Sequence, residues 1–583
     1  MFLATTALDD FWDKTQKDGI FLGDWCRLYA KQGDYADMEW KTLEYIWKDE
    51  KEIDYGIRYC DDVYNHAIDV LSSILNKIHG LNKDLRYWDI VLRPWLFQYI
   101  QIIYDKYRHL KLAKEKYPNI YTYTLHESSY SFVNTSLMSL TKIIDSDLYN
   151  LQLYSQIAKF LEINSKDIEY DYVKDDLDIT IKTKSLKEKF LLSITKIANK
   201  IFNKKSVLMV SPYFKHRPLL KYLTLSLKSK FLFVFDNFNY ALSVSNKINL
   251  SQRKIFFENI LFQNEFERIL FKTLVYSFPS IYLENYIDFR DHVLKLPIEK
   301  SKVIYSANAI HTNEIFKFYI AENHKNLLIV YAQHGGGIGL DKINISEEIE
   351  TQICDIYFTY GWQRKNTRVL PQCAIKKNSY FLKKYSNIVL VMTVLPRYFY
   401  RFMYLADSSK MLRYIYNNQI FVKEFDLFSY LTIRPYMQDY GWDIKKRLLE
   451  VNSNLTFDNK TNYYKQIKKA RLVVFDHMHT GYLETLSANI PTVIFISEDI
   501  YCFRESAMPY IKILNDANIL FYDPIKAASF INANYDDIEK WWYSSKTQQA
   551  REKFCYQYIR TSNNWVNEWI IEFNKILEKN ARN

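Results

Sequence analysis

Hydrophobic positions follow two different spacings along this chain. Residues 1–25 contain two short apolar runs, FLATTA and GIFLG, which are typical of β-strands. From about 58 to 115, apolar residues recur at helical spacing, as in YNHAIDVLSSILNKI and DIVLRPWLFQYIQIIYDKY, with Pro94 near the start of one helix. A charged segment at 165–200 is also predicted to be helical. The first quarter of the chain is therefore expected to be a strand pair followed by helices.

Beyond residue 206 the pattern changes to short β-rich runs that alternate with helical segments. The runs before the segment DIYFTYGW are SVLMVS, KFLFVFD, KVIYSAN and NLLIVYAQ, and those after it are NIVLVMTVL, YLTIRP, RLVVFD and TVIFIS. Such alternation predicts parallel βαβ units with helices on both faces of each sheet. We therefore expect an α/β protein with two Rossmann-like domains that face each other across a cleft, with helical insertions in the first.

The boundary between the two domains is expected at about 375–386, where a polar stretch precedes a new buried strand. The first domain then covers residues 1–380 and the second covers 381–545. The remaining segment, 546–583, is predicted to form a helix that packs back on the first domain, because apolar residues recur along it at helical spacing. These positions are Trp565, Trp569, Ile570, Phe573 and Ile576.

Composition narrows the class of protein. A chain of 583 residues, of which 48% are hydrophobic, is long enough for two full cores. No apolar run is long enough to span a membrane, and the first residues include acids, so a cytoplasmic location is expected. The net charge of +11 fits phosphorylated ligands or peripheral contact with the inner membrane, but also ordinary solvated loops. Nucleic acid is not an expected partner, since no RNP-like strand or basic recognition helix is present.

Glycines cluster at one place in a chain that is otherwise poor in them. Only 12 glycines occur in total, yet Gly335, Gly336, Gly337 and Gly339 directly follow the buried strand LLIVYA and the pair Gln333-His334. Glycines at the carboxyl end of a strand let the backbone approach a ligand and present amide donors to an anion. The spacing matches neither a P-loop nor a dinucleotide-binding fingerprint.

His334 lies beside these glycines and is the candidate catalytic base. Imidazole titrates near neutral pH and is suited to removing a proton from an acceptor hydroxyl. The alternative is a histidine that only holds the turn by hydrogen bonding.

A second candidate region is RLVVFDHMHTGYLETLSANIPTVIF, which reads as strand, polar loop, helix and strand. Asp476, His477, His479 and Thr480 lie between the strand and the helix, where helix amides favour a phosphate. Thr480 is alternatively the N-cap of the helix. Glu484 lies one helical turn further on, where it could reach a ribose diol, although a first-turn carboxylate is also favourable without a ligand.

Two arginines follow strands of the second domain. Arg434 ends the strand YLTIRP, and Arg397 follows NIVLVMTVL, so both guanidinium groups are expected at the same edge of the cleft. Paired guanidinium groups suit a diphosphate or a phosphate beside a carboxylate. A structural role for each arginine alone is the alternative.

Candidate acceptor-side residues lie in the first domain. Asn308, His311 and Glu314 follow the strand KVIY. His311 is a second candidate base, and helix capping by Asn308 or by Thr312 is the alternative account of this turn. Asp24, at the end of the second short strand, is a further candidate.

No cofactor and no metal are expected from the sequence. Asp176 and Asp178 form a DxD, but a lone DxD in an acidic segment is more typical of a solvated loop.

Several segments together resemble a family of transferases found with O-antigen and capsule genes. They are FLATTALDDFWD, FLGDWC, RYWDIVLRPWL, QHGGGIG and TGYLETLSANIPTVIF. More remotely, the HG loop and the late helix look like those of CDP-glycerol glycerophosphotransferases and of GT-B capsule transferases that use CMP-activated acidic sugars. The resemblance implies a GT-B-like fold, His334 as base, and Thr480 and Glu484 at the donor nucleotide. Where related enzymes tend to carry Ser or Thr pairs before the helix, this chain has His479-Thr480.

The sequence and the resemblance together predict a metal-independent glycosyltransferase. It would move a sugar from a nucleotide donor, with a CMP-sugar favoured, to a glycan or lipid-linked acceptor in surface-polysaccharide synthesis. The donor-binding set comprises Gly335, Gly336, Arg397, Arg434, Asp476, His479, Thr480 and Glu484. Two alternatives remain: a polyol-phosphate transferase of the CDP-glycerol type, and a non-catalytic scaffold of polysaccharide assembly.

Overall fold

The computed structural model describes most of the chain. It covers residues 1–171 except 36, 205–213, 224–240 except 227 and 230, 248–373 except 259, and 386–580, with isolated positions between 186 and 197. The chain divides into two compact units, which are described separately. The first comprises Met1–Pro212, Phe233–Ile329 and Pro396–Phe402, and the second comprises Tyr213–Leu232, Val330–Leu395 and Met403–Asn583.

The first unit begins with a parallel sheet in the order β3-β2-β1-β4-β5. Its strands are β1 (Phe2–Ala4), β2 (Gly19–Phe21), β3 (Lys41–Thr42), β4 (Tyr121–Leu125) and β5 (Asn164–Ile168). The expected strand pair is therefore part of a larger sheet, completed by strands that come from far along the chain. The segment predicted to be helical from 165 is wrong at its start, because it begins inside β5.

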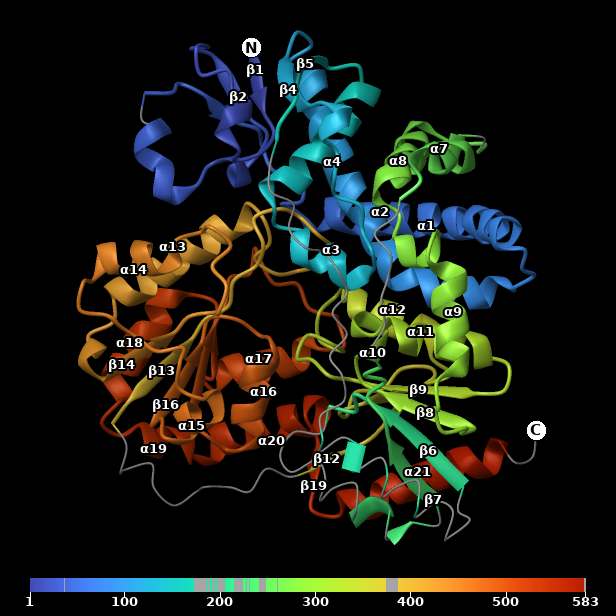
Figure 1. Cartoon of the computed structure of the whole chain (residues 1–583). Helices are drawn as coiled ribbons and strands as arrows, with labels where there is room; N and C mark the ends of the chain where they lie inside the picture. Colours follow the sequence, from blue (N-terminus) through green and yellow to red (C-terminus); the bar gives the residue numbers. More distant parts are fainter. Residues whose placement is uncertain are drawn as a thin grey trace. The chain divides into compact units, whose positions relative to one another are not determined.

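Two long helices, α1 and α2, lie between β3 and β4 of this sheet in the sequence (Figure 1). Helix α2 packs against α1 and α4 and is buried along most of its length, including the polar residues Gln101, Asp105 and His109. Pro94 lies inside α2 and not near its start, so that expectation is wrong. The helices of the first unit are α1 (Glu50–His79), α2 (Leu85–Lys116), α3 (Leu137–Ile143), α4 (Asp147–Phe160), α7 (Leu250–Glu258), α8 (Glu265–Ser277), α9 (Tyr286–Lys295), α10 (Ala309–Thr312) and α11 (Glu314–Asn323).

A second sheet has the strand order β11-β10-β9-β8-β6-β7. Its strands are β6 (Lys205–Val210), β7 (Phe231–Phe235), β8 (Val303–Ser306), β9 (Leu328–Ala332), β10 (Ile356–Thr359) and β11 (Thr367–Val369). The pairings of β6 with β8, β9 with β10 and β10 with β11 are parallel. Every strand expected from the β-rich runs of this part of the sequence is present. The buried positions are consecutive and do not alternate, as in a sheet that helices cover on both faces.

A third sheet, entirely within the second unit, has the order β15-β14-β13-β16-β17-β18. The first strand along the chain is therefore central, and the order reverses between β13 and β16, as in a Rossmann fold. The strands are β13 (Ile388–Val391), β14 (Leu431–Arg434), β15 (Thr456–Phe457), β16 (Leu472–Phe475), β17 (Thr492–Phe495) and β18 (Leu520–Phe521). Ligands of such sheets bind beyond the carboxyl ends of the strands at the point of reversal.

Helices cover both faces of this third sheet (Figure 1). On one side α13 packs against α14 and α18, and on the other α20 packs against α16 and α17. The parallel sheets and their helical layers confirm the predicted α/β class with Rossmann-like sheets. The helices of the second unit are α12 (Ile345–Ile353), α13 (Lys410–Lys423), α14 (Ile444–Val451), α15 (Tyr463–Lys468), α16 (Thr480–Ser487), α17 (Met508–Asp516), α18 (Pro524–Asn534), α19 (Ile538–Trp542), α20 (Ser545–Tyr558) and α21 (Trp565–Asn580).

The carboxy-terminal helix α21 packs against the segment around β10 and β12 (Gln372–Cys373). Trp569 Nε1 donates a hydrogen bond to the Pro371 carbonyl at 2.8 Å, and Phe573 contacts Phe358. Beside them, β12 pairs with β19 (Thr561–Ser562). Most of the expected boundary at 375–386 lies outside the described residues. In the described part of the chain, no helix is both long enough and apolar enough to cross a membrane.

Candidate functional site

The glycine loop after β9 lies directly against the residue that precedes α16, and both belong to the second unit. A Cβ atom on Gly336 would lie 2.2 Å from the His479 carbonyl oxygen, so only glycine fits there. Gly339 has a φ of +82°, a left-handed conformation that also favours glycine. The structure thus brings together two motifs that lie about 140 residues apart in the sequence.

Gln333 holds the loop in this position. Its side-chain amide donates to the carbonyls of Gly335 (3.0 Å) and Ile338 (3.1 Å). Its oxygen accepts from the Tyr360 amide (3.0 Å) and from Trp362 Nε1 (2.8 Å). All of these contacts are made by a side chain that is only 2% exposed. The sequence placed Gln333 beside His334 but did not indicate this organising role.

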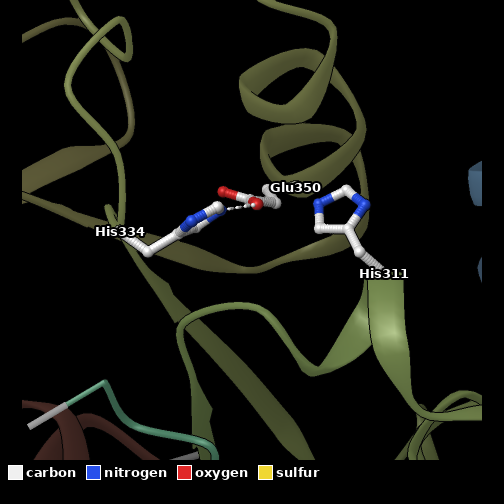
Figure 2. A group of neighbouring side chains, drawn as sticks. All are labelled: His311, His334 and Glu350. Atoms are coloured by element: carbon white, nitrogen blue, oxygen red, sulfur yellow. Dashed lines mark hydrogen bonds and ion pairs between the residues drawn. The ribbon is translucent and has the colours of Figure 1, made fainter. Parts of the chain in front are cut away.

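His334 forms a hydrogen-bonded relay with two residues that were not predicted. Its Nε2 lies 2.8 Å from Glu350 Oε1 (Figure 2). The Tyr357 hydroxyl donates to Glu350 Oε2, also at 2.8 Å. Glu350 comes from α12 and Tyr357 from β10, and both are buried. The sequence offered one signal for Glu350 as a site residue, which is that this acid lies among the apolar positions Ile349 and Ile353 of a short helix.

The contact with Glu350 constrains the tautomer of His334. When Glu350 is ionised it can only accept hydrogen bonds, and His334 Nε2 is then the donor. The His334 side chain is 20% exposed, whereas Glu350 is fully buried. The ring of Tyr213 packs edge-on against the imidazole, with centroids 5.9 Å apart. A histidine oriented in this way by a buried carboxylate has the arrangement of a general base.

The start of α16 differs in one detail from the prediction. The N-cap is His479 and Thr480 is the first helical residue, so the alternative of Thr480 as the N-cap is wrong. The ring of His479 is directed to Thr393, with Nδ1 3.3 Å from Oγ1. Thr393 follows β13 and His479 follows β16, so the two residues flank the point where the strand order reverses.

Glu484 lies one turn further along α16 and is 8% exposed. The Tyr464 hydroxyl donates to its carboxylate at 3.3 Å. Burial, and then the charge of Glu484, raises the pKa of both Tyr463 and Tyr464, so their hydroxyls stay protonated. These tyrosines of α15 were not predicted as site residues.

Arg434 ends β14 as expected and lies beside the same group. Its guanidinium donates to Gln466 Oε1 at 2.9 Å and to the Thr461 carbonyl at 2.7 Å, and it lies over the Tyr463 ring. It is therefore positioned by α15 and by the loop before it.

Asp476 is 2% exposed and forms internal hydrogen bonds. His477 Nδ1 lies 2.7 Å from its Oδ1, and Tyr414 donates to its Oδ2. The contact of Asp476 with a donor nucleotide remains a prediction.

Arg397 is buried within the first unit. Its guanidinium forms an ion pair with Asp147 (2.9 Å) and donates to the Trp25 carbonyl (2.9 Å). Burial by itself lowers the pKa of this guanidinium. The neighbouring Tyr398 and Asp147 raise the pKa by more, so the net shift is upward. We therefore leave Arg397 out of the proposed donor site. Asp24, another first-unit candidate, forms an exposed ion pair with Arg27.

The remaining acceptor-side candidates lie around α10 and α11 of the first unit. His311, drawn in Figure 2, is a residue of α10. Asn308 precedes that helix without capping it through its side chain, and Asn313 instead caps α11 by accepting from the Phe316 amide at 3.0 Å. Asn308 therefore occupies the N-cap position of α10, as the capping alternative expected, although its side chain forms no capping hydrogen bond, and Thr312 is the last residue of α10.

Glu314 is the most buried of these candidates. Its carboxylate accepts from Lys317 Nζ at 2.8 Å and from the Tyr282 hydroxyl at 2.9 Å. These partners indicate a structural role for Glu314, and its contact with an acceptor remains a prediction.

Two groups bear on metal binding. Asp176 and Asp178 lie outside the described residues. In the second unit, His334 and Glu350 would supply two ligand atoms to a cation, whereas a structural zinc site uses four.

Comparisons with solved structures give partial similarities at low sequence identity. Anabaena HepE in complex with UDP and glucose is 10% identical, with 64% of this chain and 99% of that chain covered and a TM-score of 0.34. A glycosyltransferase from Rickettsia africae is 10% identical, with coverages of 65% and 100% and a TM-score of 0.32. The wall teichoic acid polymerase TagF is 9% identical, with coverages of 68% and 95% and a TM-score of 0.30. No curated protein matches the chain.

Because these TM-scores are below 0.5, the assignment of the chain rests on the family model. The model that describes the LIC12162 family transferases matches residues 1–573, almost the whole sequence, and the protein therefore belongs to the LIC12162 family of transferases.

Proposed function

We propose that this transferase moves a sugar from a nucleotide donor to a glycan or lipid-linked acceptor in surface-polysaccharide synthesis. The observation that carries the proposal is the close approach of Gly336 to His479. It puts an oriented histidine, a glycine loop and the start of a helix in one unit, and these are the parts that a nucleotide-sugar transfer needs. Membership of a transferase family supports the reaction class.

In the proposed reaction His334 Nδ1 takes the proton of the acceptor hydroxyl. The acceptor oxygen then forms a bond to the anomeric carbon of the donor sugar. The bond between that carbon and the phosphate oxygen breaks, and the nucleotide leaves with the bonding electrons. Glu350 stabilises the imidazolium that forms, because its buried carboxylate accepts the Nε2–H hydrogen bond.

The phosphate of the leaving nucleotide is proposed to lie at the start of α16. The first amides of a helix have no partners within the helix, and the helix dipole favours negative charge there. Thr480 and the amides of Gly335 and Gly336 supply further donors, and Arg434 adds positive charge. Glu484 and Tyr464 are proposed to hold the ribose. These groups stabilise the leaving charge without requiring a divalent metal.

The test is product analysis by mass spectrometry. The full-length protein is incubated with CMP-, UDP-, GDP- and CDP-activated donors and a panel of alkyl glycosides as acceptors, with and without EDTA. We expect a glycosylated product, with a CMP-sugar as the best donor, and no loss of product in EDTA. His334→Ala should lower turnover by about 10² to 10⁴, the usual contribution of a general base.

Each other outcome excludes a defined part of the proposal. Transfer of a polyol phosphate would favour the CDP-glycerol alternative. Loss of product in EDTA would reject the metal-independent mechanism. Donor binding without turnover of any donor would favour the scaffold, and unchanged turnover in His334→Ala would assign the base role to another group.

A further inference from the structure

The first unit contains a pocket that the proposed reaction does not use. It has a volume of about 530 Å³ and lies between the start of α1, the end of α2 and the loop that precedes α1. This volume is within the range of small-molecule sites. We propose that it binds an uncharged segment of a glycan, which deepens the proposed function because that glycan would be the acceptor or the product.

A row of tyrosine rings forms one wall of the pocket. Tyr55 and Tyr59 lie one turn apart on α1 with nearly parallel rings, at 18° and with centroids 6.3 Å apart. Tyr59 in turn stacks on Tyr104 of α2 at 4.8 Å and 29°. Tyr55 ends the row and is 52% exposed, so a large aromatic ring is accessible at the pocket. A flat aromatic surface of this kind suits the apolar face of a pyranose ring.

The charges around the pocket are balanced. Four carboxylates and four cations line it, and each cation has a carboxylate partner. Arg108 lies 3.5 Å from Glu52, and Lys111 lies 3.0 Å from Glu265. The other two cations, Lys48 and Lys116, both pair with Glu44. Because no cation is in excess, the pocket favours an uncharged ligand over a phosphate or a nucleotide.

Polar groups beside the rings match sugar hydroxyls. Arg108 donates to the Tyr104 hydroxyl at 2.9 Å, and Lys111 donates to the Tyr107 hydroxyl at 2.9 Å. Guanidinium, ammonium, carboxylate and phenol groups are therefore all present among the residues that line the pocket. This combination provides donors and acceptors for the edge of a sugar and a stacking surface for its face.

The experiment is saturation-transfer-difference NMR with titration on the full-length protein. The probes are maltohexaose, cellohexaose and chitohexaose, with CMP and inorganic phosphate as anionic probes. We expect a hexasaccharide to bind at millimolar concentration and Tyr55→Ala to weaken it by about five- to tenfold, the contribution of one aromatic stacking contact. Tyr55→Phe keeps the ring and should keep the binding.

Tyr416→Ala is the matched control, because Tyr416 is 53% exposed and lies on α13 of the other unit. Its hexasaccharide affinity should equal that of the unchanged protein. The proposal is overturned if no hexasaccharide binds, if Tyr55→Ala binds as tightly as the control, or if CMP or phosphate binds and is lost in Tyr55→Ala.

An activity measurement separates this inference from the proposed function. In the transferase assay, Tyr55→Ala should raise KM for a hexasaccharide acceptor and leave kcat and the KM for a monosaccharide acceptor unchanged. Hexasaccharide binding without any transfer would support the pocket and contradict the proposed function. Transfer without hexasaccharide binding would support the proposed function and contradict the pocket as a glycan site.

Discussion

A side chain on Gly336 would begin 2.2 Å from the carbonyl oxygen of His479, and this single approach joins the glycine loop to the start of α16. Backbone lies against backbone at this point. The loop that carries His334 and the helix that carries Thr480 and Glu484 are therefore held in a defined relation.

Gly336→Ala should destabilise the second unit and separate the loop from α16. Overpacking of this kind typically costs about 1–3 kcal/mol. Gly335→Ala is the matched control, because the nearest atom to its new methyl group would be 3.9 Å away. Differential scanning calorimetry should show a lower Tm for Gly336→Ala and almost no change for Gly335→Ala. Equal shifts in both variants would contradict the steric argument.

Glu350→Gln should lower kcat by about 10² to 10⁴ with little change in KM, because an amide can donate to Nε2 and stabilise the wrong tautomer of His334. Tyr357→Phe removes only one hydrogen bond to the carboxylate and should have a smaller effect, about tenfold. Steady-state kinetics on both variants measure this. If Glu350→Gln retained full kcat, the relay would have a purely structural role.

Nucleotide binding should depend on Glu484. A ligand that binds only the native state raises apparent stability by about 2.7 kcal/mol at 100 times its Kd. A thermal-shift series over CMP, CDP, UDP, GDP and ADP, with and without EDTA, should give the largest shift with CMP. Glu484→Ala should abolish most of that shift, whereas Glu505→Ala, on an exposed residue of the same unit, should not. A larger shift with UDP or GDP would reject the cytidine donor.

Glu314 and Lys317 should be important for stability and not for acceptor binding. Both side chains are almost fully buried, and removing one partner of such a pair leaves an uncompensated charge at a cost of about 3–5 kcal/mol. Lys317→Met should therefore lower the Tm, and Glu314→Gln combined with Lys317→Met should recover part of the loss. A raised acceptor KM in Glu314→Gln with unchanged Tm would instead restore its predicted acceptor role.

Asp145→Asn should stabilise the protein at neutral pH. Burial raises the pKa of Asp145 to about 6, above its ordinary value of 3.8. The folded state therefore binds the proton more tightly than the unfolded state, and the cost of ionising the buried carboxyl is complete above pH 6 and absent below pH 3.8. The asparagine variant should gain about 2–3 kcal/mol at pH 7.5 and nothing at pH 3.5. A gain that did not depend on pH would reject this cause.

The pattern of apolar residues by itself determined the α/β class and the strands that the β-rich runs indicated, which are β6, β7, β8, β9, β13, β14, β16 and β17. It also identified the glycine loop and the α16 region as separate candidates. Local sequence was sufficient because a buried parallel strand is a short continuous apolar run, and because glycines cluster where the backbone must approach another group closely.

Only the tertiary structure decided how these parts meet. β4 and β5 were not predicted, because β4 joins the sheet by pairing with β1 and β5 by pairing with β4, and these partners lie far apart in the sequence. Glu350 became a partner of His334, and Arg397 became a buried ion-pair residue, through contacts that no local pattern encodes. A side chain's role depends on what packing places beside it, and packing between distant segments is a property of the folded chain as a whole.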